Sequence, residues 1–190
     1  MKPNFVAFAG SLREGSYNKH LARAATRAAT AAGASVTLID LRDFPMPLYD
    51  QDMEMHDGLP EHARRFQELL KANHGFIISS PEYNSSTPGV LKNAIDWASR
   101  GKPPEPLAAF RGKTAALTSA SPGNLGGIRG LMTLRSILGN IGVFLLPDQL
   151  AVPRAHEAFA EDGNLKDAKQ QAVLEHLMQE LVRVTDRLVS

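Results

Sequence analysis

The chain has 190 residues, of which 43% are hydrophobic, and its 21 basic and 20 acidic side chains give a formal charge of +1. This length predicts a single domain, residues 1–190, with one sizeable core. The charges are interspersed and form no basic stripe, which argues against a nucleic-acid partner, and the lack of Cys excludes disulfides and thiolate chemistry. No apolar run is long enough for membrane insertion and no signal-peptide core precedes the first strand, so we expect a cytoplasmic protein.

The first predicted unit is a strand, a polar loop and a helix. An apolar run, Phe5 to Ala9, ends at Gly10, and an Ala-rich helical pattern runs from about Tyr17 to Ala32 before a C-cap at Gly33. The candidate ligand side chains of this loop and the first helical turn are Ser11, Arg13, Ser16 and Asn18. Hydroxyls, a guanidinium and the free N–H groups of a helix N-terminus suit an anion, so we expect a phosphate here.

An ordinary turn is the alternative for this loop, with Ser16 capping the helix and Arg13 in solvent. The loop matches neither G-x-x-x-x-G-K-[ST] nor G-x-G-x-x-G, which disfavours a P-loop nucleotide triphosphatase and an NAD-binding Rossmann domain.

A second strand is predicted over Ser35 to Ile39, and a long loop, Leu41 to Leu59, follows it. This loop is rich in acids, but no pair of its Asp, Glu and His residues has a recognisable metal-ligand spacing. We therefore assign no metal site and expect a solvated loop.

The third unit begins with a helix that opens at Pro60, ends near Asn73 and precedes an apolar strand, Gly75 to Ser80. The strand enters a polar loop made of Pro81, Glu82, Tyr83 and Asn84. The next helix is predicted to have Thr87 as its N-cap and Pro88 as its first residue, to run to about Ser99, and to lead into a Pro-rich connection, Gly101 to Phe110.

The last units follow the same alternation. A fourth strand, Thr114 to Ser119, enters a loop whose candidate ligand groups are Ser119, Ser121 and Gly123. A helix carrying Leu131 to Ile141 leads to a fifth strand over residues 143–152, interrupted at Pro147, and a final amphipathic helix runs from about Leu165 to Val189.

Five strands that alternate with helices predict a doubly wound α/β fold with a parallel sheet covered on both faces. Such sheets bind ligands at the carboxyl ends of their strands, where the loops after strands one, three and four meet. Tyr83 offers an aromatic face, Asn84 a donor and an acceptor, and Gly123 a close backbone approach. The three loops together suit a flat heterocycle with a phosphate tail, although each alone also reads as an ordinary turn.

These motifs resemble the NADPH-dependent FMN reductase family, and most of all its quinone, chromate and azo-dye reductases. The resemblance rests on Gly10-Ser11-Leu12-Arg13 with Ser16 and Asn18, on Pro81-Glu82-Tyr83-Asn84, on Pro88 to Trp97, and on Ser121-Pro122-Gly123 with Gly126-Gly127. It spans roughly residues 5–146. It implies a flavodoxin-like five-stranded sheet in the order 2-1-3-4-5 and non-covalently bound FMN. In the family pattern, Ser11, Arg13, Ser16 and Asn18 hold the phosphate, Pro81 to Asn84 line the isoalloxazine, and Ser119 to Gly123 approach its pyrimidine side.

The resemblance implies an oxidoreductase that passes hydride from NADPH or NADH through FMN to a small-molecule acceptor such as a quinone, with chromate, azo dyes and free flavin as other acceptors. The flavin performs the chemistry, so no catalytic side chain is assigned. A flavodoxin-like electron carrier is the alternative, although the near-neutral charge argues against it. A Ser hydrolase is disfavoured because the chain has no G-x-S-x-G elbow.

The resemblance also implies a homodimer or homotetramer, with Arg100 near a subunit interface. Trp97 is large and apolar, and it is either an anchor of that interface or part of the core of one chain.

Overall fold

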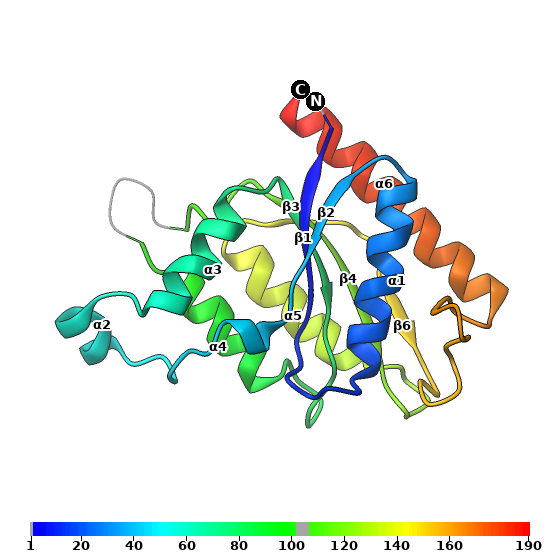
Figure 1. Cartoon of the computed structure of the whole chain (residues 1–190), viewed down its shortest axis with the longest axis horizontal. Helices are drawn as coiled ribbons and strands as arrows, with labels where there is room; N and C mark the ends of the chain where they lie inside the picture. Colours follow the sequence, from blue (N-terminus) through cyan, green and yellow to red (C-terminus); the bar gives the residue numbers. More distant parts are fainter. Residues whose placement is uncertain (1, 102–106) are drawn as a thin grey trace.

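A computed structural model describes residues 2–101 and 107–190, so residues 102–106 of the expected Pro-rich connection lie outside the described part. The centre of the fold is a parallel sheet of β1 (Asn4–Ala9), β2 (Ser35–Leu38), β3 (Gly75–Ser79), β4 (Thr114–Ala120), β5 (Phe144–Leu145) and β6 (Leu150–Val152). Its order is β2-β1-β3-β4-β5, and β6 pairs with β4 farther along the same edge (Figure 1). The predicted flavodoxin-like order and the break in the fifth strand are confirmed.

Helices cover both faces of this sheet (Figure 1). α1 (Tyr17–Ala31) and α6 (Ala168–Val189) pack on one face, and α3 (Glu61–Lys71), α4 (Gly89–Ala98) and α5 (Ile128–Asn140) pack on the other. The alternation of β1 shows why both faces are apolar: Phe5 joins the cluster under α1 and α6, while Val6 joins the cluster under the other three helices. None of the described helices combines the length and the apolar character that a membrane crossing requires.

Two predicted helix starts are wrong, that of α4 by one residue and that of α6 (Ala168–Val189) by about three. Pro88 is the N-cap of α4, so Thr87 lies outside the helix, where its Oγ1 faces the carbonyl of Gly130 at 3.5 Å. The last helix begins at Ala168 rather than near Leu165, because the Asp167 carboxylate accepts hydrogen bonds from the first free N–H groups of α6.

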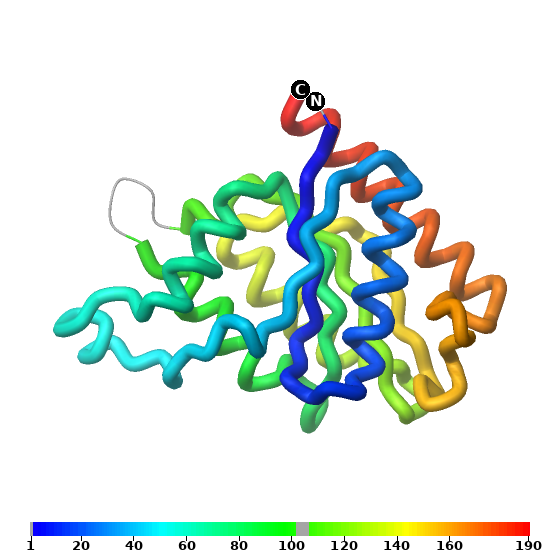
Figure 2. The backbone as a smooth tube through the Cα atoms, viewed as in Figure 1, coloured from blue at the N-terminus to red at the C-terminus, as the bar shows by residue number. Residues whose placement is uncertain are grey.

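The predicted loop over residues 41–59 is wrong in part, because it contains a 3₁₀ turn, Leu41–Asp43, and a short helix, α2 (Gln51–Asp57). Asp40 and Asp50 cap these two pieces by accepting hydrogen bonds from backbone N–H groups. No side chain of α2 is buried. Residues 44–59, here called the arm, project from the body of the molecule (Figures 1 and 2).

The root of the arm is fastened to α4. Trp97 is fully buried, its Nε1–H donates to the carbonyl oxygen of Pro47 at 2.8 Å, and its ring meets that of Tyr49 edge-on at 5.0 Å. Asn93 also binds the arm, through Pro47 O and Tyr49 N. The core alternative for Trp97 is therefore confirmed, and the interface-anchor alternative is wrong.

Arg100 has a local role in the same region. Its Nε donates to Glu54 of α2 at 3.1 Å, and its guanidinium lies 5.1 Å from the centre of the Tyr49 ring. The Tyr49 hydroxyl donates to the same Glu54 carboxylate at 2.8 Å. Arg100 thus helps to hold α2 in its projecting position.

Candidate functional site

The loops after β1, β3 and β4 meet in one cleft of about 370 Å³ at the carboxyl edge of the sheet. Its lining consists of Ser11, Arg13, Ser16, Tyr17, Asn18, Pro81, Glu82, Tyr83, Ala120, Ser121 and Pro122. Eight of the eleven candidate residues from the sequence are in this lining. Asn84, Ser119 and Gly123 are outside it. Ala120 and Pro122 fall within the predicted segment Ser119 to Gly123 although they were not named singly, and the sequence reasoning missed Tyr17.

The part of the cleft at the N-terminus of α1 suits an anion. Ser16 occupies the N-cap position and is buried, but its side chain makes no capping hydrogen bond, so the side-chain cap of the ordinary-turn alternative is wrong. The first turn of α1 contains no acidic residue. The free N–H groups and the partial positive charge of this helix end therefore face the cleft together with an uncommitted hydroxyl.

Arg13 adds a cation at the same end of the cleft. Ser11 shapes the loop by accepting a hydrogen bond from the backbone N–H of Arg13 at 3.2 Å. The exposed guanidinium of Arg13 lies over the ring of Tyr17, 5.3 Å from its centre. Partial burial, followed by the charges of Arg23 and Arg13, lowers the pKa of His20, which is consistent with a positive field around this helix end.

Asn18 lies between two of the loops and is 2% exposed. Its Oδ1 accepts a hydrogen bond from the backbone N–H of Ala120, and its Nδ2 donates to the carbonyl oxygen of the same residue, both at 2.9 Å. The side-chain amide thus joins the first turn of α1 to the end of β4.

The loop after β3 is a tight hairpin. The backbones of Tyr83 and Ser86 exchange two hydrogen bonds of 3.1 Å, and the two residues between them, Asn84 and Ser85, have φ of 52° and 63°. Positive φ at two consecutive residues other than Gly is strained, and such strain concentrates at functional sites. The hairpin presents the half-exposed ring of Tyr83.

Glu82 fixes this hairpin against α5. Its Oε2 accepts a hydrogen bond from the backbone N–H of Gly130 at 2.9 Å, which satisfies a free donor in the first turn of α5. Gly127, the N-cap of that helix, has φ of 90° and no side chain that could do so. The Glu82 carboxylate is therefore already engaged by the protein.

Of the residues predicted in the loop after β4, Ser121 lines the cleft and Ser119 does not. Ser119 is fully buried, its Oγ has no hydrogen-bond partner, and a Cβ on Gly127 would lie only 2.0 Å from it. This hydroxyl therefore lies beneath the start of α5 rather than in the cleft. Ser121 lines the cleft, and its Oγ accepts a hydrogen bond from the backbone N–H of the exposed Gly123 at 3.3 Å.

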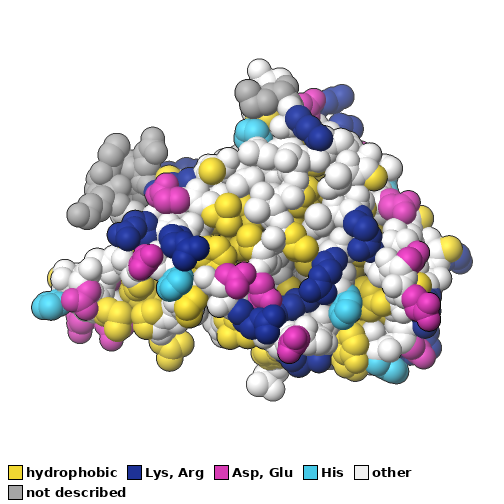
Figure 3. Space-filling model, viewed as in Figure 1, with side chains coloured by type: hydrophobic (Ala, Val, Ile, Leu, Met, Phe, Trp, Pro, Cys, Tyr) yellow, Lys and Arg dark blue, Asp and Glu magenta, His cyan; other side chains and the backbone are white. Residues whose placement is uncertain are grey.

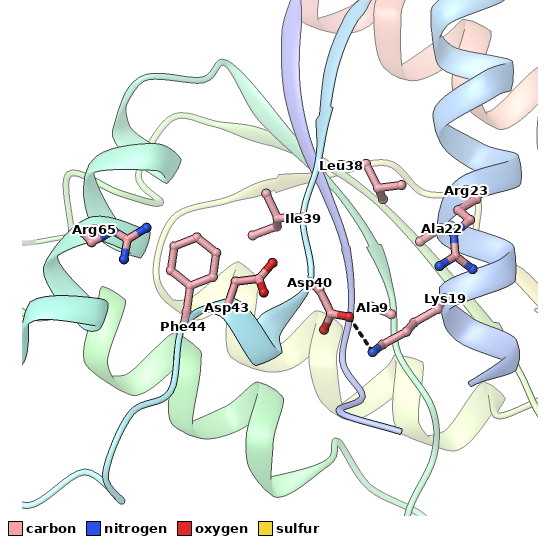
Figure 4. Close-up of a pocket in the computed structure, with 10 residues that line it drawn as sticks. All are labelled: Ala9, Lys19, Ala22, Arg23, Leu38, Ile39, Asp40, Asp43, Phe44 and Arg65. Atoms are coloured by element: carbon pink, nitrogen blue, oxygen red, sulfur yellow. Dashed lines mark hydrogen bonds and ion pairs between the residues drawn. The ribbon is translucent and has the colours of Figure 1, made fainter. Parts of the chain in front are cut away.

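A larger hollow of about 560 Å³ lies beside the open edge of β2 (Figure 4). Arg23 and Arg65 border it from opposite sides, and Lys19 reaches Asp40 across 2.7 Å. Partial burial raises the pKa of Asp40, but hydrogen bonds from Lys19 and Arg42 outweigh this effect and hold the pKa below its usual value. The central charges of this hollow thus neutralise one another, whereas Arg13 in the cleft forms no ion pair with any residue that the structure describes.

The sequence model of the NADPH-dependent FMN reductase family matches residues 3–157. The chain belongs to this family. An NAD(P)H-dependent FMN reductase of Pseudomonas aeruginosa, PA1204, is 38% identical, with 93% of this chain and 91% of that protein covered. A quinone reductase of Escherichia coli K12 is 35% identical over 95% of this chain and 92% of its own length.

Solved structures agree with this family assignment. FerB, a flavoenzyme NAD(P)H:(acceptor) oxidoreductase of Paracoccus denitrificans, superposes with a TM-score of 0.82 at 28% identity, covering 98% of each chain. A flavodoxin from the domain Archaea reaches a TM-score of 0.62 at 10% identity, covering 96% of this chain and 99% of that one, so it shows the fold alone. The predicted enzyme class, an FMN-dependent NAD(P)H oxidoreductase, is confirmed over the electron-carrier alternative.

The cleft fits the cofactor of this family. The phosphate of FMN needs donors and positive charge, which Ser16, Arg13 and the N-terminus of α1 supply. The ring system needs a flat apolar contact and nearby backbone, which Tyr83 and the loop after β4 provide.

Proposed function

We propose that this family member binds FMN in the cleft and uses NADPH or NADH to reduce a quinone. The Ser16 hydroxyl makes no capping hydrogen bond at a helix whose first turn holds no acidic residue, and Arg13 lines the same cleft; this is the observation that carries the assignment of the phosphate end. Bound FMN supplies the hydride-transfer chemistry. The chain itself binds and orients: the α1 end holds the phosphate, and the 81–84 segment together with Ser121 holds the ring.

The quinone is proposed from the surroundings of the cleft and from the relatives. Each of the three loops that form the cleft carries an exposed apolar side chain. These side chains are Leu12, Tyr83 and Leu125, which are 46%, 50% and 51% exposed. A flat apolar acceptor fits such a border better than a small oxyanion does. Several relatives at 33–36% identity are named quinone reductases or 2-hydroxy-1,4-benzoquinone reductase, which supports the same class.

The function is tested by steady-state kinetics of the FMN-loaded protein with NADPH or NADH and a benzoquinone. Because donor and acceptor share one cleft, they must bind in turn, so we expect parallel double-reciprocal lines. Intersecting lines would refute the shared cleft. Faster turnover with chromate, an azo dye or free flavin than with the quinone would refute the proposed acceptor.

The phosphate assignment is tested with Arg13→Ala. Losing a charge-assisted hydrogen bond costs about 1.5–3 kcal/mol, so the dissociation constant of FMN should rise about tenfold to 150-fold. The exposed guanidinium lies over the Tyr17 ring and forms no ion pair within the described residues, so folding should change little. Unchanged FMN affinity in a fluorescence titration would contradict the assignment.

We also propose that the arm pairs the chain with a second copy in a homodimer. The arm exposes Leu48 (81%) and Met55 (77%) and carries four carboxylates without any Lys or Arg. Figure 3 shows hydrophobic and acidic side chains together on it. An apolar groove of about 280 Å³ lies between the arm root and α4, lined by Leu12, Leu41, Arg42, Phe44, Pro45, Met46, Val90, Asn93 and Ala94. Apolar side chains flanked by carboxylates complement a groove bordered by an arginine.

Light scattering tests this pairing. A monomer of the unaltered chain at micromolar concentration would refute it, and a tetramer would show that a further surface takes part. The double variant Leu48→Asp with Met55→Asp should yield monomers, whereas Val173→Asp, at an exposed position of α6, should leave the mass unchanged.

A cytoplasmic location is proposed as well, which the Cys-free composition suits.

A further inference from the structure

Asn18 is predicted from the family pattern to hold the phosphate, but in the structure its amide is already used. Its oxygen and one of its N–H groups form a closed pair of hydrogen bonds with the backbone of Ala120, which is 102 residues away in the chain. The side chain is 2% exposed, and both bonds are buried. The remaining N–H and the second lone pair of the oxygen are the amide's unused positions, and only the N–H could serve an anion such as a phosphate.

The Asn18–Ala120 pair lies at the cleft itself. Asn18 lies two residues after Ser16, in the first turn of α1, where the anion-binding groups gather. Ala120 is the last residue of β4 and precedes Ser121 and Pro122, which line the same cleft. The pair therefore fixes the first turn of α1, beside the anion-binding groups, against the start of the loop after β4.

We propose that Asn18 is a positioning residue, which sets the spacing of the two loops, rather than a direct phosphate ligand. This inference rests on the proposed assignment of FMN to the cleft. A residue that binds the phosphate directly contributes to the affinity only for a flavin with a phosphate group. A residue that sets the spacing of the cleft, as a clamp between its loops, contributes to the affinity for every flavin. Riboflavin, which lacks the phosphate, distinguishes the two roles.

The experiment compares the dissociation constants of FMN and riboflavin in three variants. Arg13→Ala should weaken FMN about tenfold to 150-fold and leave riboflavin within about twofold, because its partner is the phosphate. Asn18→Ala should weaken both flavins about tenfold or more, by factors that agree within about threefold. A loss confined to FMN, or no loss of either, would overturn the inference.

Lys19→Met is the matched structural control. Lys19 is the next residue of the same helical turn and is 92% buried along its side chain, but it ties α1 to Asp40 beyond β2, away from the cleft loops. The Lys19→Met variant should lower the urea midpoint of the apoprotein, while its riboflavin affinity should stay within about twofold of that of the unaltered protein. If Lys19→Met weakens riboflavin as much as Asn18→Ala does, Asn18 acts only through general stability and the inference fails.

A measurement on the unaltered protein covers the case in which Asn18→Ala does not fold. The side-chain amide protons of Asn18 should be protected from exchange in the apoprotein and should give the same NMR signals with riboflavin as with FMN. A signal that moves with FMN alone would overturn the clamp. If the unaltered chain binds neither flavin, the proposed function fails, and amide protection in the apoprotein still decides whether the clamp exists.

Discussion

A substitution of Gly130 by Ala tests whether α5 supports the hairpin that carries Tyr83. A Cβ at Gly130 would lie 3.2 Å from the Cα and the Cβ of Glu82 and 3.2 Å from the carbonyl oxygen of Ser86. These contacts are shorter than an ordinary van der Waals separation of about 3.5–4.0 Å between carbon atoms. The hairpin would therefore have to move away from the helix by a few tenths of an ångström.

The hairpin has little freedom to make this movement. Its ends are joined by two backbone hydrogen bonds, and Glu82 is bound to the backbone N–H of Gly130 itself. Overpacking of this kind costs about 1–3 kcal/mol, while Ala instead of Gly in a helix contributes up to about 1 kcal/mol. We expect the free energy of unfolding to fall by about 1 kcal/mol, and FMN affinity to fall with it because the Tyr83 ring is displaced.

Gly139→Ala is the control in the same helix. A Cβ there would meet only Leu145 Cδ1, at 3.9 Å, so the variant should gain up to about 1 kcal/mol from helix propensity and bind FMN unchanged. Urea unfolding of the two apoproteins and flavin fluorescence titration measure both effects. If Gly130→Ala is as stable as Gly139→Ala and binds FMN equally well, α5 does not support the hairpin.

Two further predictions concern the ion pair between Lys19 and Asp40 and the hydrogen bond that Trp97 donates to the arm. Asp40→Asn should lower the free energy of unfolding by about 1–3 kcal/mol at pH 7, because it leaves the buried Lys19 without its partner. The pKa of Asp40 is depressed in the folded state, so its contribution is present at neutral pH and is lost on acidification: urea midpoints of the two proteins should converge below about pH 3.9. Equal midpoints at pH 7 would contradict the ion pair's role. Trp97→Phe keeps most of the buried ring but loses the bond to Pro47, so it should cost about 1 kcal/mol and speed amide exchange in the arm; unchanged exchange there would show that the arm is held elsewhere.

The sheet could be predicted from the sequence because its strands are short apolar runs between Gly-, Pro- and Ser-rich loops. Residues 75–79 are all buried, as a continuous apolar run in a doubly covered sheet should be. The order of the strands came from the family resemblance, since periodicity alone identifies strands and not their neighbours.

The arm could not be predicted from periodicity, because α2 has no buried side chain and therefore no apolar stripe. Local signals were nevertheless present: Asp40 and Asp50 each precede a helical turn and accept its free N–H groups. The contacts that hold the arm, from Trp97 and Asn93 to Pro47, join residues 46–50 positions apart, and such pairings are not encoded in local sequence.

For the candidate site, too, the sequence predicted which residues come together but not the hydrogen bonds that they form. The sequence indicated which loops meet at the carboxyl edge and which polar groups they carry, because that follows from the topology of a parallel sheet. It did not indicate which polar groups are already engaged. Asn18 with Ala120 and Glu82 with Gly130 are pairs of residues 102 and 48 positions apart in the chain, and they appear only once the chain is folded.

This distinction gives a physical criterion for separating ligands from supports in such a cleft. Most buried polar groups have a hydrogen-bond partner, so a group that the protein already satisfies loses little when the cofactor is absent, and it contributes to binding through the geometry it imposes. By this criterion Asn18 and Glu82 are supports, because their hydrogen bonds are complete without a ligand. Ser16 and Arg13 make no such bonds from their side chains within the described residues, which leaves them available to the phosphate that we propose binds here. Two residues of one short motif, Ser16 and Asn18, are thereby assigned to different tasks.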